Sequence, residues 1–194
     1  MASQAGKAIG AVVAGSFIAT EKGRFFNRLV WMRPDGSFEH YDKRHLFSPA
    51  SEHETYAAGK KKLLVALNGW NICPLICYDL RFPVWSRNVE GYDLLLYIAN
   101  WPDRRSHHWK SLLLARAIEN QCYVVGVNRC GQDGAGLRYS GDTAVIDFGG
   151  KVLYQAAAHS EEISTISLSW EMLLEYRAGL QFLADRDEFE IFVR

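Results

Sequence analysis

The sequence is organised around Ile76-Cys77-Tyr78-Asp79-Leu80-Arg81-Phe82-Pro83-Val84-Trp85-Ser86-Arg87, where an apolar run ends and a proline-led helix begins. A thiol at such a junction lies near the positive end of a helix dipole and near free backbone N–H groups, and both lower the pKa of a thiol. This stretch therefore indicates a nucleophile at Cys77. The alternative is a small buried side chain, since free cysteine is among the most buried residue types. From these residues alone the two interpretations have similar weight.

Apolar segments before and after the junction predict strands. Asn68-Gly69 separates two such segments, residues 63–67 and 71–76, and predicts a hairpin between them. Residues 92–99 form a nearly continuous apolar run, which predicts a strand covered on both faces. Asn100-Trp101-Pro102 ends that strand.

A helical pattern follows the strand predicted at residues 92–99. Ser106 is a suitable N-cap for a helix to about residue 121, in which Trp109, Leu113 and Ala117 recur at helical intervals. Similar signals predict strands at residues 11–19, 25–32, 37–41, 123–128, 143–148, 151–156 and 162–168, and a helix at residues 170–177. Strands that alternate with helices and hairpins predict a layered α/β domain with a mixed sheet.

A long polar stretch, residues 42–62, has neither a helical nor a strand period, and a loop of this length is usually functional. Lys43 begins it and is followed by the apolar pair Leu46-Phe47, so its ammonium is either held in a partly buried site or solvated beside Arg44. Without further information the solvated interpretation is favoured. The carboxylate of Glu52 has the same two interpretations.

The composition is that of an ordinary globular protein. The chain has 194 residues, of which 48% are hydrophobic and 23% charged, enough for one domain spanning residues 1–194. Lys plus Arg and Asp plus Glu number 22 each, so no overall field attracts the chain to nucleic acid or to a membrane, and we expect neither as a partner. The four cysteines contain no C-x-x-C pair, which favours reduced thiols and a cytoplasmic location.

Several other catalytic and cofactor patterns are missing from the sequence. No serine lies in a G-x-S-x-G frame, which argues against a Ser-His-Asp hydrolase. His107 and His108 are adjacent, so they point apart on a helix and do not predict a zinc site. The glycine-rich residues 131–136 lack a phosphate-binding frame. We therefore expect no metal and no cofactor.

Five blocks of residues occur in the order and spacing typical of one enzyme superfamily. They are Tyr41-Asp42-Lys43-Arg44-His45-Leu46-Phe47, Glu52, Cys77-Tyr78-Asp79-Leu80-Arg81-Phe82-Pro83, Asn100-Trp101-Pro102 and Ala115-Arg116-Ala117-Ile118-Glu119-Asn120-Gln121. In these blocks the chain resembles the nitrilase, or carbon-nitrogen hydrolase, superfamily, and most closely its bacterial omega-amidase branch. The resemblance runs from about residue 11 to the C-terminus.

The resemblance implies a nitrilase-like four-layer α-β-β-α sandwich and a cysteine-dependent amidase. Cys77 matches the nucleophile, which forms a thioester as ammonia leaves. Lys43 matches the lysine that stabilises the tetrahedral oxyanion together with the backbone N–H of Tyr78, and such donors contribute about 3 kcal/mol each in other acyl-transfer enzymes. Glu52 matches a glutamate that positions Lys43 and the substrate amide.

The resemblance also implies a small-molecule partner and self-association. The expected substrates are terminal amides of short 2-oxo dicarboxylic acids, and the expected assembly is a homodimer or a higher homo-oligomer. Arg81 and Arg116 are candidates for binding a substrate carboxylate, and the alternative for both is a structural ion pair. Glu119, three residues after Arg116, favours that alternative for Arg116. Trp101 is expected to line the pocket.

One feature of the superfamily has no counterpart in the sequence. Its triad glutamate lies in a Pro-Glu motif within a first strand-helix-strand unit, and this chain contains no Pro-Glu dipeptide. The glutamates before Lys43 are Glu21 and Glu39, neither of which follows a proline, and Glu21 is a poor substitute. We therefore expect an N-terminally truncated domain with exposed strand edges and apolar surface. The alternatives to an omega-amidase are a catalytically impaired remnant that binds a partner or oligomerises, or a nitrilase or acyltransferase of the same superfamily.

Overall fold

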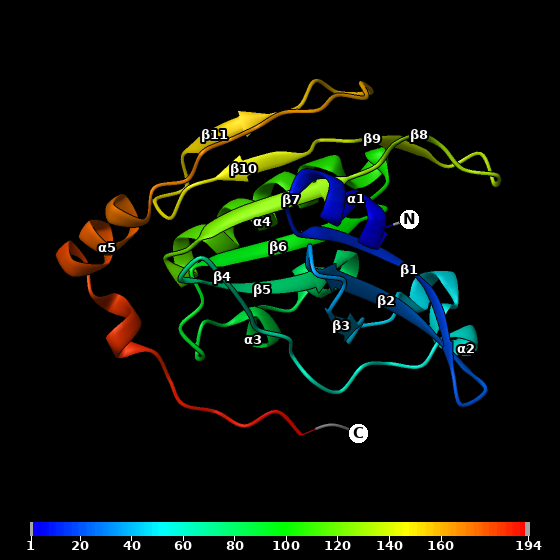
Figure 1. Cartoon of the computed structure of the whole chain (residues 1–194), viewed down its shortest axis with the longest axis horizontal. Coiled ribbons are helices and arrows are strands. Elements are labelled where there is room, and N and C mark those ends of the chain that lie inside the picture. The colour runs from blue at the N-terminus through cyan, green and yellow to red at the C-terminus, as the bar shows by residue number, and fades with distance from the viewer. Residues whose placement is uncertain (1, 193–194) are drawn as a thin grey trace.

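A six-stranded mixed sheet carries the junction at Cys77 in the computed structural model, which describes residues 2–192 (Figure 1). The strand order is β11-β10-β7-β6-β5-β4, and the three central strands β5, β6 and β7 are parallel. The strands are β4 (Val65–Leu67), β5 (Trp70–Ile76), β6 (Leu94–Ala99), β7 (Tyr123–Asn128), β10 (Ala144–Ile146) and β11 (Val152–Gln155). The predicted hairpin joins β4 to β5, and both of its turn residues have positive φ, 49° at Asn68 and 86° at Gly69.

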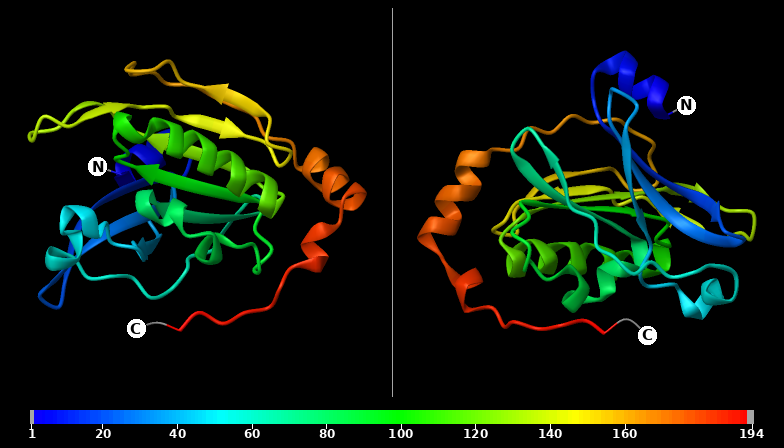
Figure 2. Two further views of the ribbon diagram at one scale, coloured as in Figure 1. Left: turned by 180° about the vertical axis from the view of Figure 1, so that it is seen from behind. Right: turned by 60° about the horizontal axis from the view of Figure 1, so that its bottom comes forward.

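Helix α4 (Ser106–Asn120) covers one face of this sheet (Figure 2). Its side chains Trp109, Leu113 and Ala117 are fully buried in one core cluster with residues of β5, β6 and β7. The helix approaches β7 closely at Gly126, where an added Cβ would lie 2.6 Å from a methyl carbon of Leu113. The apolar stripe predicted for this helix is therefore the surface that packs on the sheet.

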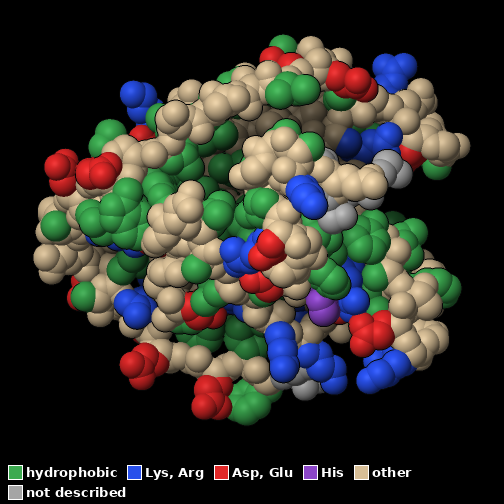
Figure 3. Space-filling model, viewed as in Figure 1, with side chains coloured by type: hydrophobic (Ala, Val, Ile, Leu, Met, Phe, Trp, Pro, Cys, Tyr) green, Lys and Arg blue, Asp and Glu red, His purple; other side chains and the backbone are tan. Residues whose placement is uncertain are grey.

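The opposite face of the sheet is less completely covered. On β6, Leu94, Leu96 and Ile98 are half-buried, whereas the alternate residues that face α4 are buried. The strand predicted within residues 92–99 is therefore present as β6, with one face buried and the other only partly covered, where Leu94 and Leu96 pack against the cluster around Trp31. Figure 3 shows apolar side chains gathered on this face of the molecule.

A three-stranded antiparallel sheet lies partly over that face. Its strands are β1 (Val13–Glu21), β2 (Arg24–Met32) and β3 (Phe38–Asp42), in that order. Trp31 of β2 packs against Val65 and Ile72 of the larger sheet. The first strand was predicted to be buried, but Phe17 and Ile18 are 54% and 63% exposed, because little of the described chain covers either face of β1 at these residues.

The remaining elements are short. They are α1 (Ala2–Ile9), α2 (Glu52–Thr55), α3 (Pro83–Ser86), α5 (Trp170–Gly179), β8 (Cys130–Gln132), β9 (Arg138–Ser140) and the 3₁₀ segments η1 (Ser48–Ala50), η2 (Cys77–Arg81), η3 (Asp103–Arg105) and η4 (Phe182–Asp185). The β8–β9 hairpin was not predicted, since a glycine-rich segment occupies its turn. Residues 162–168 were predicted as a strand and have irregular structure.

The start of α4 also differs from the prediction. Ser106 is its first helical residue and not its N-cap, because η3 leads directly into the helix and gives Ser106 helical dihedrals, φ −51° and ψ −44°. Within residues 2–192, no helix has the length and apolar character needed to cross a membrane.

Candidate active site

Cys77 lies on a sharp backbone turn between β5 and η2. Its φ is 44°, in the left-handed region that costs an L-residue roughly 1–2 kcal/mol. The turn ends the buried strand at Ile76 and directs the following 3₁₀ segment away from the sheet. A strained position of this kind presents the side chain of Cys77 just beyond the carboxyl end of the central parallel strand β5.

The buried carboxylate of Asp79 holds this turn in place. It accepts hydrogen bonds from the backbone N–H of Ile76 at 3.1 Å and from the backbone N–H of His45 at 3.0 Å. The hydroxyl of Tyr41 donates a further bond of 2.7 Å. Tyr41 and His45 flank Lys43, so one carboxylate connects the cysteine turn with the lysine segment.

The ammonium of Lys43 is buried and paired. It lies 2.6 Å from Oε2 of Glu52, and the residue is 3% exposed. The same carboxylate accepts the backbone N–H of Phe47 at 2.6 Å and the side-chain amide of Asn27 at 3.3 Å. Of the two interpretations of Lys43, the structure has the partly buried site and not the solvated lysine.

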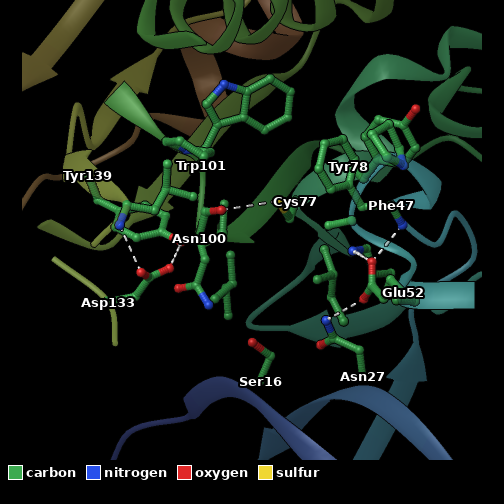
Figure 4. A pocket seen from close by; sticks show the side chains of 18 of the residues that line it. Ser16, Asn27, Phe47, Glu52, Cys77, Tyr78, Asn100, Trp101, Asp133 and Tyr139 are labelled. Atoms are coloured by element: carbon green, nitrogen blue, oxygen red, sulfur yellow. Dashed lines mark hydrogen bonds and ion pairs between the residues drawn. The ribbon is translucent and has the colours of Figure 1, made fainter. Parts of the chain in front are cut away.

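The thiol of Cys77 and the Lys43–Glu52 pair line one pocket of about 540 Å³. Figure 4 shows Cys77 between the side chains of Trp101 and Glu52, with Ser16 of β1 at the lower side. Asp133, before the turn of the β8–β9 hairpin, lines the wall below Trp101. Cys77, Lys43, Glu52, Tyr78, Arg81 and Trp101, the six residues predicted for the site, all line this pocket.

The environment of the thiol differs from the expectation. Burial raises the pKa of Cys77 above that of an ordinary thiol, and the charge of Lys43 only partly opposes this effect. The backbone oxygen of Asn100, 3.9 Å from the sulfur, also lowers the pKa of the thiol in part. The predicted lowering of the pKa is therefore wrong. The helical segment that begins at Cys77 is a five-residue 3₁₀ segment, which supplies little of the dipole that the prediction assumed.

The two arginines considered for a substrate carboxylate lie in different surroundings. Arg81 lies in the pocket, with its guanidinium 4.7 Å from the ring centre of Trp101 and Nη2 3.1 Å from Nδ1 of His108. Arg116 is buried outside the pocket, where it donates to the backbone oxygen of Leu80 at 2.7 Å and pairs with Glu119 at 2.9 Å. The structural ion pair predicted for Arg116 is confirmed.

Sequence reasoning missed several residues that line the pocket. Asn27 gave no local signal, and Asp133 and Tyr139 lie on the unpredicted β8–β9 hairpin. Arg104 and Arg105 follow Asn100-Trp101-Pro102 after a single residue, Asp103, so their position in the sequence was a usable signal.

The carboxylates of the site are few. Glu21 pairs with Arg28 at 2.9 Å and does not line the pocket. Among the pocket residues that the structure describes, Glu52 and Asp133 are the only carboxylates. No group of three or more His, Cys, Asp or Glu side chains within residues 2–192 has the arrangement of a metal site.

Comparison with known proteins places this chain in a family. A family model described as carbon-nitrogen hydrolase matches residues 1–178. The chain belongs to the carbon-nitrogen hydrolase family. The omega-amidase YafV of Escherichia coli (strain K12) is 49% identical over 182 residues, which are 94% of this chain and 71% of that protein. A 2-oxoglutaramate amidase of Bacillus subtilis (strain 168) is 39% identical, over 90% of this chain and 68% of that protein.

Solved carbon-nitrogen hydrolases have the same fold. The crystal structure of XC1258 from Xanthomonas campestris, a superfamily protein with an arsenic adduct in its active site, is 45% identical. It superposes with a TM-score of 0.96 over 98% of this chain and 75% of that one. The predicted nitrilase-like layered α/β fold is therefore confirmed.

Proposed function

We propose that this carbon-nitrogen hydrolase cleaves the terminal amide of a small carboxylic acid and releases ammonia. The observation that carries the proposal is the presentation of Cys77, on its left-handed turn, in the same pocket as the buried Lys43–Glu52 pair. The names of two relatives, an omega-amidase and a 2-oxoglutaramate amidase, support this substrate class.

The pocket residues account for the steps of such a reaction. The sulfur of Cys77 bonds to the amide carbon, and the ammonium of Lys43 and the backbone N–H of Tyr78 stabilise the oxyanion that forms. The carbon–nitrogen bond then breaks, and ammonia leaves with the proton that the thiol carried. Water attacks the thioester, which gives the carboxylic acid and restores the thiol.

The other predicted residues hold the reacting groups. Glu52 keeps the ammonium of Lys43 in position, since it is itself fixed by Phe47 and Asn27. Arg81 binds the substrate carboxylate, and the ring of Trp101 supports its guanidinium from one side.

The test is ammonia release from a 2-oxo dicarboxylic acid monoamide. Cys77→Ala is expected to abolish release, and Lys43→Met is expected to lower it by about 10²- to 10³-fold because an oxyanion donor is lost. Cys130→Ala is the matched control, since Cys130 does not line the pocket. Undiminished release by Cys77→Ala would refute the role of the thiol. A nitrile and an amine acceptor, assayed in parallel, separate a nitrilase or an acyltransferase from an amidase.

A second candidate function is a catalytically impaired module that binds a partner or oligomerises. It is supported by the raised thiol pKa and by the engagement of Glu52 with three donors, which leaves that carboxylate poorly placed to act as a general base. Purified protein that gives no ammonia above a Cys77→Ala blank, with a stable folded state, would favour this candidate.

We also propose a single domain over residues 1–194 that forms a cytoplasmic homodimer or a higher homo-oligomer. The four free cysteines support a reducing compartment. The half-covered face of β6 supports self-association, since apolar area of this kind is usually buried in an assembly. The mass in solution, measured by light scattering, tests the assembly.

A further inference from the structure

Three arginines line the pocket beside Cys77: Arg81 at the end of η2, and Arg104 and Arg105 in η3. Lys43 is a fourth cation of the pocket, but Glu52 neutralises it at 2.6 Å. The three arginines therefore concentrate positive charge in one place, although the whole chain has equal numbers of basic and acidic residues.

The remaining carboxylate of the pocket does not compensate them. Asp133 accepts the hydroxyl of Tyr139 at 2.9 Å and the backbone N–H of Leu137 at 2.9 Å. Among the described residues, no carboxylate lies within 4.0 Å of the guanidinium of Arg81, Arg104 or Arg105. The excess charge of this pocket is thus left without a protein partner.

Arg105 is the member of the group with the most restricted position. It is partly buried, whereas Arg104 is exposed. Its guanidinium lies 5.2 Å from the ring centre of Phe47, whose backbone N–H holds Glu52. This contact packs the side chain of Arg105 against the loop that carries the Lys43–Glu52 pair.

The electrostatic state of Arg105 agrees with this geometry. Burial lowers the pKa of its guanidinium, and the like charges of Arg104 and Arg81 lower it further. A nearby thiolate at Cys77 has the opposite effect, so Arg105 is within electrostatic range of the reacting sulfur. A bound anion would relieve this repulsion.

We propose that Arg105 determines specificity for an anionic substrate, by binding the carboxylate at the end of the amide that is remote from the scissile bond. Its planar guanidinium donates two parallel hydrogen bonds to that carboxylate, and Arg81 contacts it from the other side. The ligand class is a short acid with an amide at one end and a carboxylate, alone or beside a 2-oxo group, at the other. This inference rests on the proposed amidase function and adds to it a residue that selects charged over neutral amides.

The kinetic test compares two amides of equal length, one ending in a carboxylate and one ending in a methyl group. Arg105→Met keeps an unbranched side chain against Phe47 and removes the charge. It is expected to lower kcat/KM for the anionic amide by about 10- to 100-fold, the loss typical of a hydrogen bond to a charged group, and to change the neutral amide less than about threefold. Arg138→Met, on the exposed part of β9 outside the pocket, is the matched control and is expected to change neither.

Two kinetic outcomes would overturn the inference. Equal losses for both amides would mean that Arg105 is structural, and unchanged values for both would mean that it does not contact the substrate. Arg105→Lys separates charge from shape, since it should recover part of the loss but not the two-bond geometry. The urea midpoint of each variant checks that the fold is unchanged.

A binding measurement separates this inference from the proposed function. Glutarate, a short dicarboxylate, is titrated by calorimetry into the Cys77→Ala protein with and without Arg105→Met. A Kd raised about 10-fold or more by Arg105→Met supports the inference even if the unmodified chain releases no ammonia, which would refute the amidase proposal alone. If Arg105→Met leaves the Kd unchanged, or if glutarate binds neither protein, the inference is overturned. The amidase proposal would still stand in that case if the unmodified chain releases ammonia.

Discussion

The hydroxyl of Tyr41 donates a 2.7 Å hydrogen bond to the buried carboxylate of Asp79. Tyr41 is two residues before Lys43, and Asp79 is two residues after Cys77. Trp85 donates its indole N–H to the same hydroxyl at 3.0 Å. The relative position of the proposed nucleophile and the proposed oxyanion donor therefore depends on one buried polar network.

Tyr41→Phe is expected to lower the free energy of unfolding by about 1–3 kcal/mol, because Asp79 loses a donor and Trp85 loses its acceptor inside the core. Urea unfolding followed by tryptophan fluorescence measures this change. Tyr154→Phe, on the edge strand β11, is the control and should be nearly neutral. Ammonia release should fall about tenfold or more, since small shifts between reacting groups are costly. Unaltered stability and activity would show that the network does not position the site.

The pH dependence of thiol labelling tests the environment of Cys77. Because burial raises its pKa and the thiolate is the reactive form, labelling should accelerate with rising pH through a midpoint above that of an ordinary thiol, about 8.5. Lys43→Met should move the midpoint further upward, since the ammonium now lowers it. Rate constants between about pH 6 and 11, measured in a Cys130→Ser background, give both midpoints. A midpoint that falls or stays constant in Lys43→Met would contradict the assigned contact.

Arg116 is expected to matter for stability and not for substrate binding. Arg116→Met removes the 2.7 Å bond to the backbone oxygen of Leu80 and should lower the free energy of unfolding by about 1–3 kcal/mol. The KM for an anionic amide should remain within about twofold, in contrast with Arg81→Met, which should raise it about 10-fold or more. A large rise in KM for Arg116→Met, with unchanged stability, would reverse the two assignments.

Local signals predicted much of the fold. Asn68-Gly69 specifies its turn through backbone conformation alone, and the apolar stripe that ends near residue 121 specifies a helix face, so both could be identified from neighbouring residues. The exposure of β1 could not be predicted from its own residues, because it depends on which other parts of the chain cover that strand.

The site was predicted unevenly for the same reason. The positions of Cys77, Lys43 and Glu52 came from blocks that match a known family, and all three line one pocket. The raised pKa of the thiol is a property of burial in the folded chain, and the sequence around Cys77 suggested the opposite. The position of Arg105 near Asn100-Trp101-Pro102 was a usable signal, but its packing against Phe47 depends on the folded chain and no spacing rule predicts it.

The left-handed backbone of Cys77 implies a trade-off between stability and activity at a single position. With φ at 44°, glycine would suit this turn better than any residue that carries a β-carbon. Cys77→Gly is therefore expected to be more stable than Cys77→Ala by roughly 1 kcal/mol in urea unfolding, while both lack activity. An alanine variant as stable as the glycine variant would show that the turn is unstrained. If the difference is found, the thiol is retained at a position where the fold alone would favour no side chain.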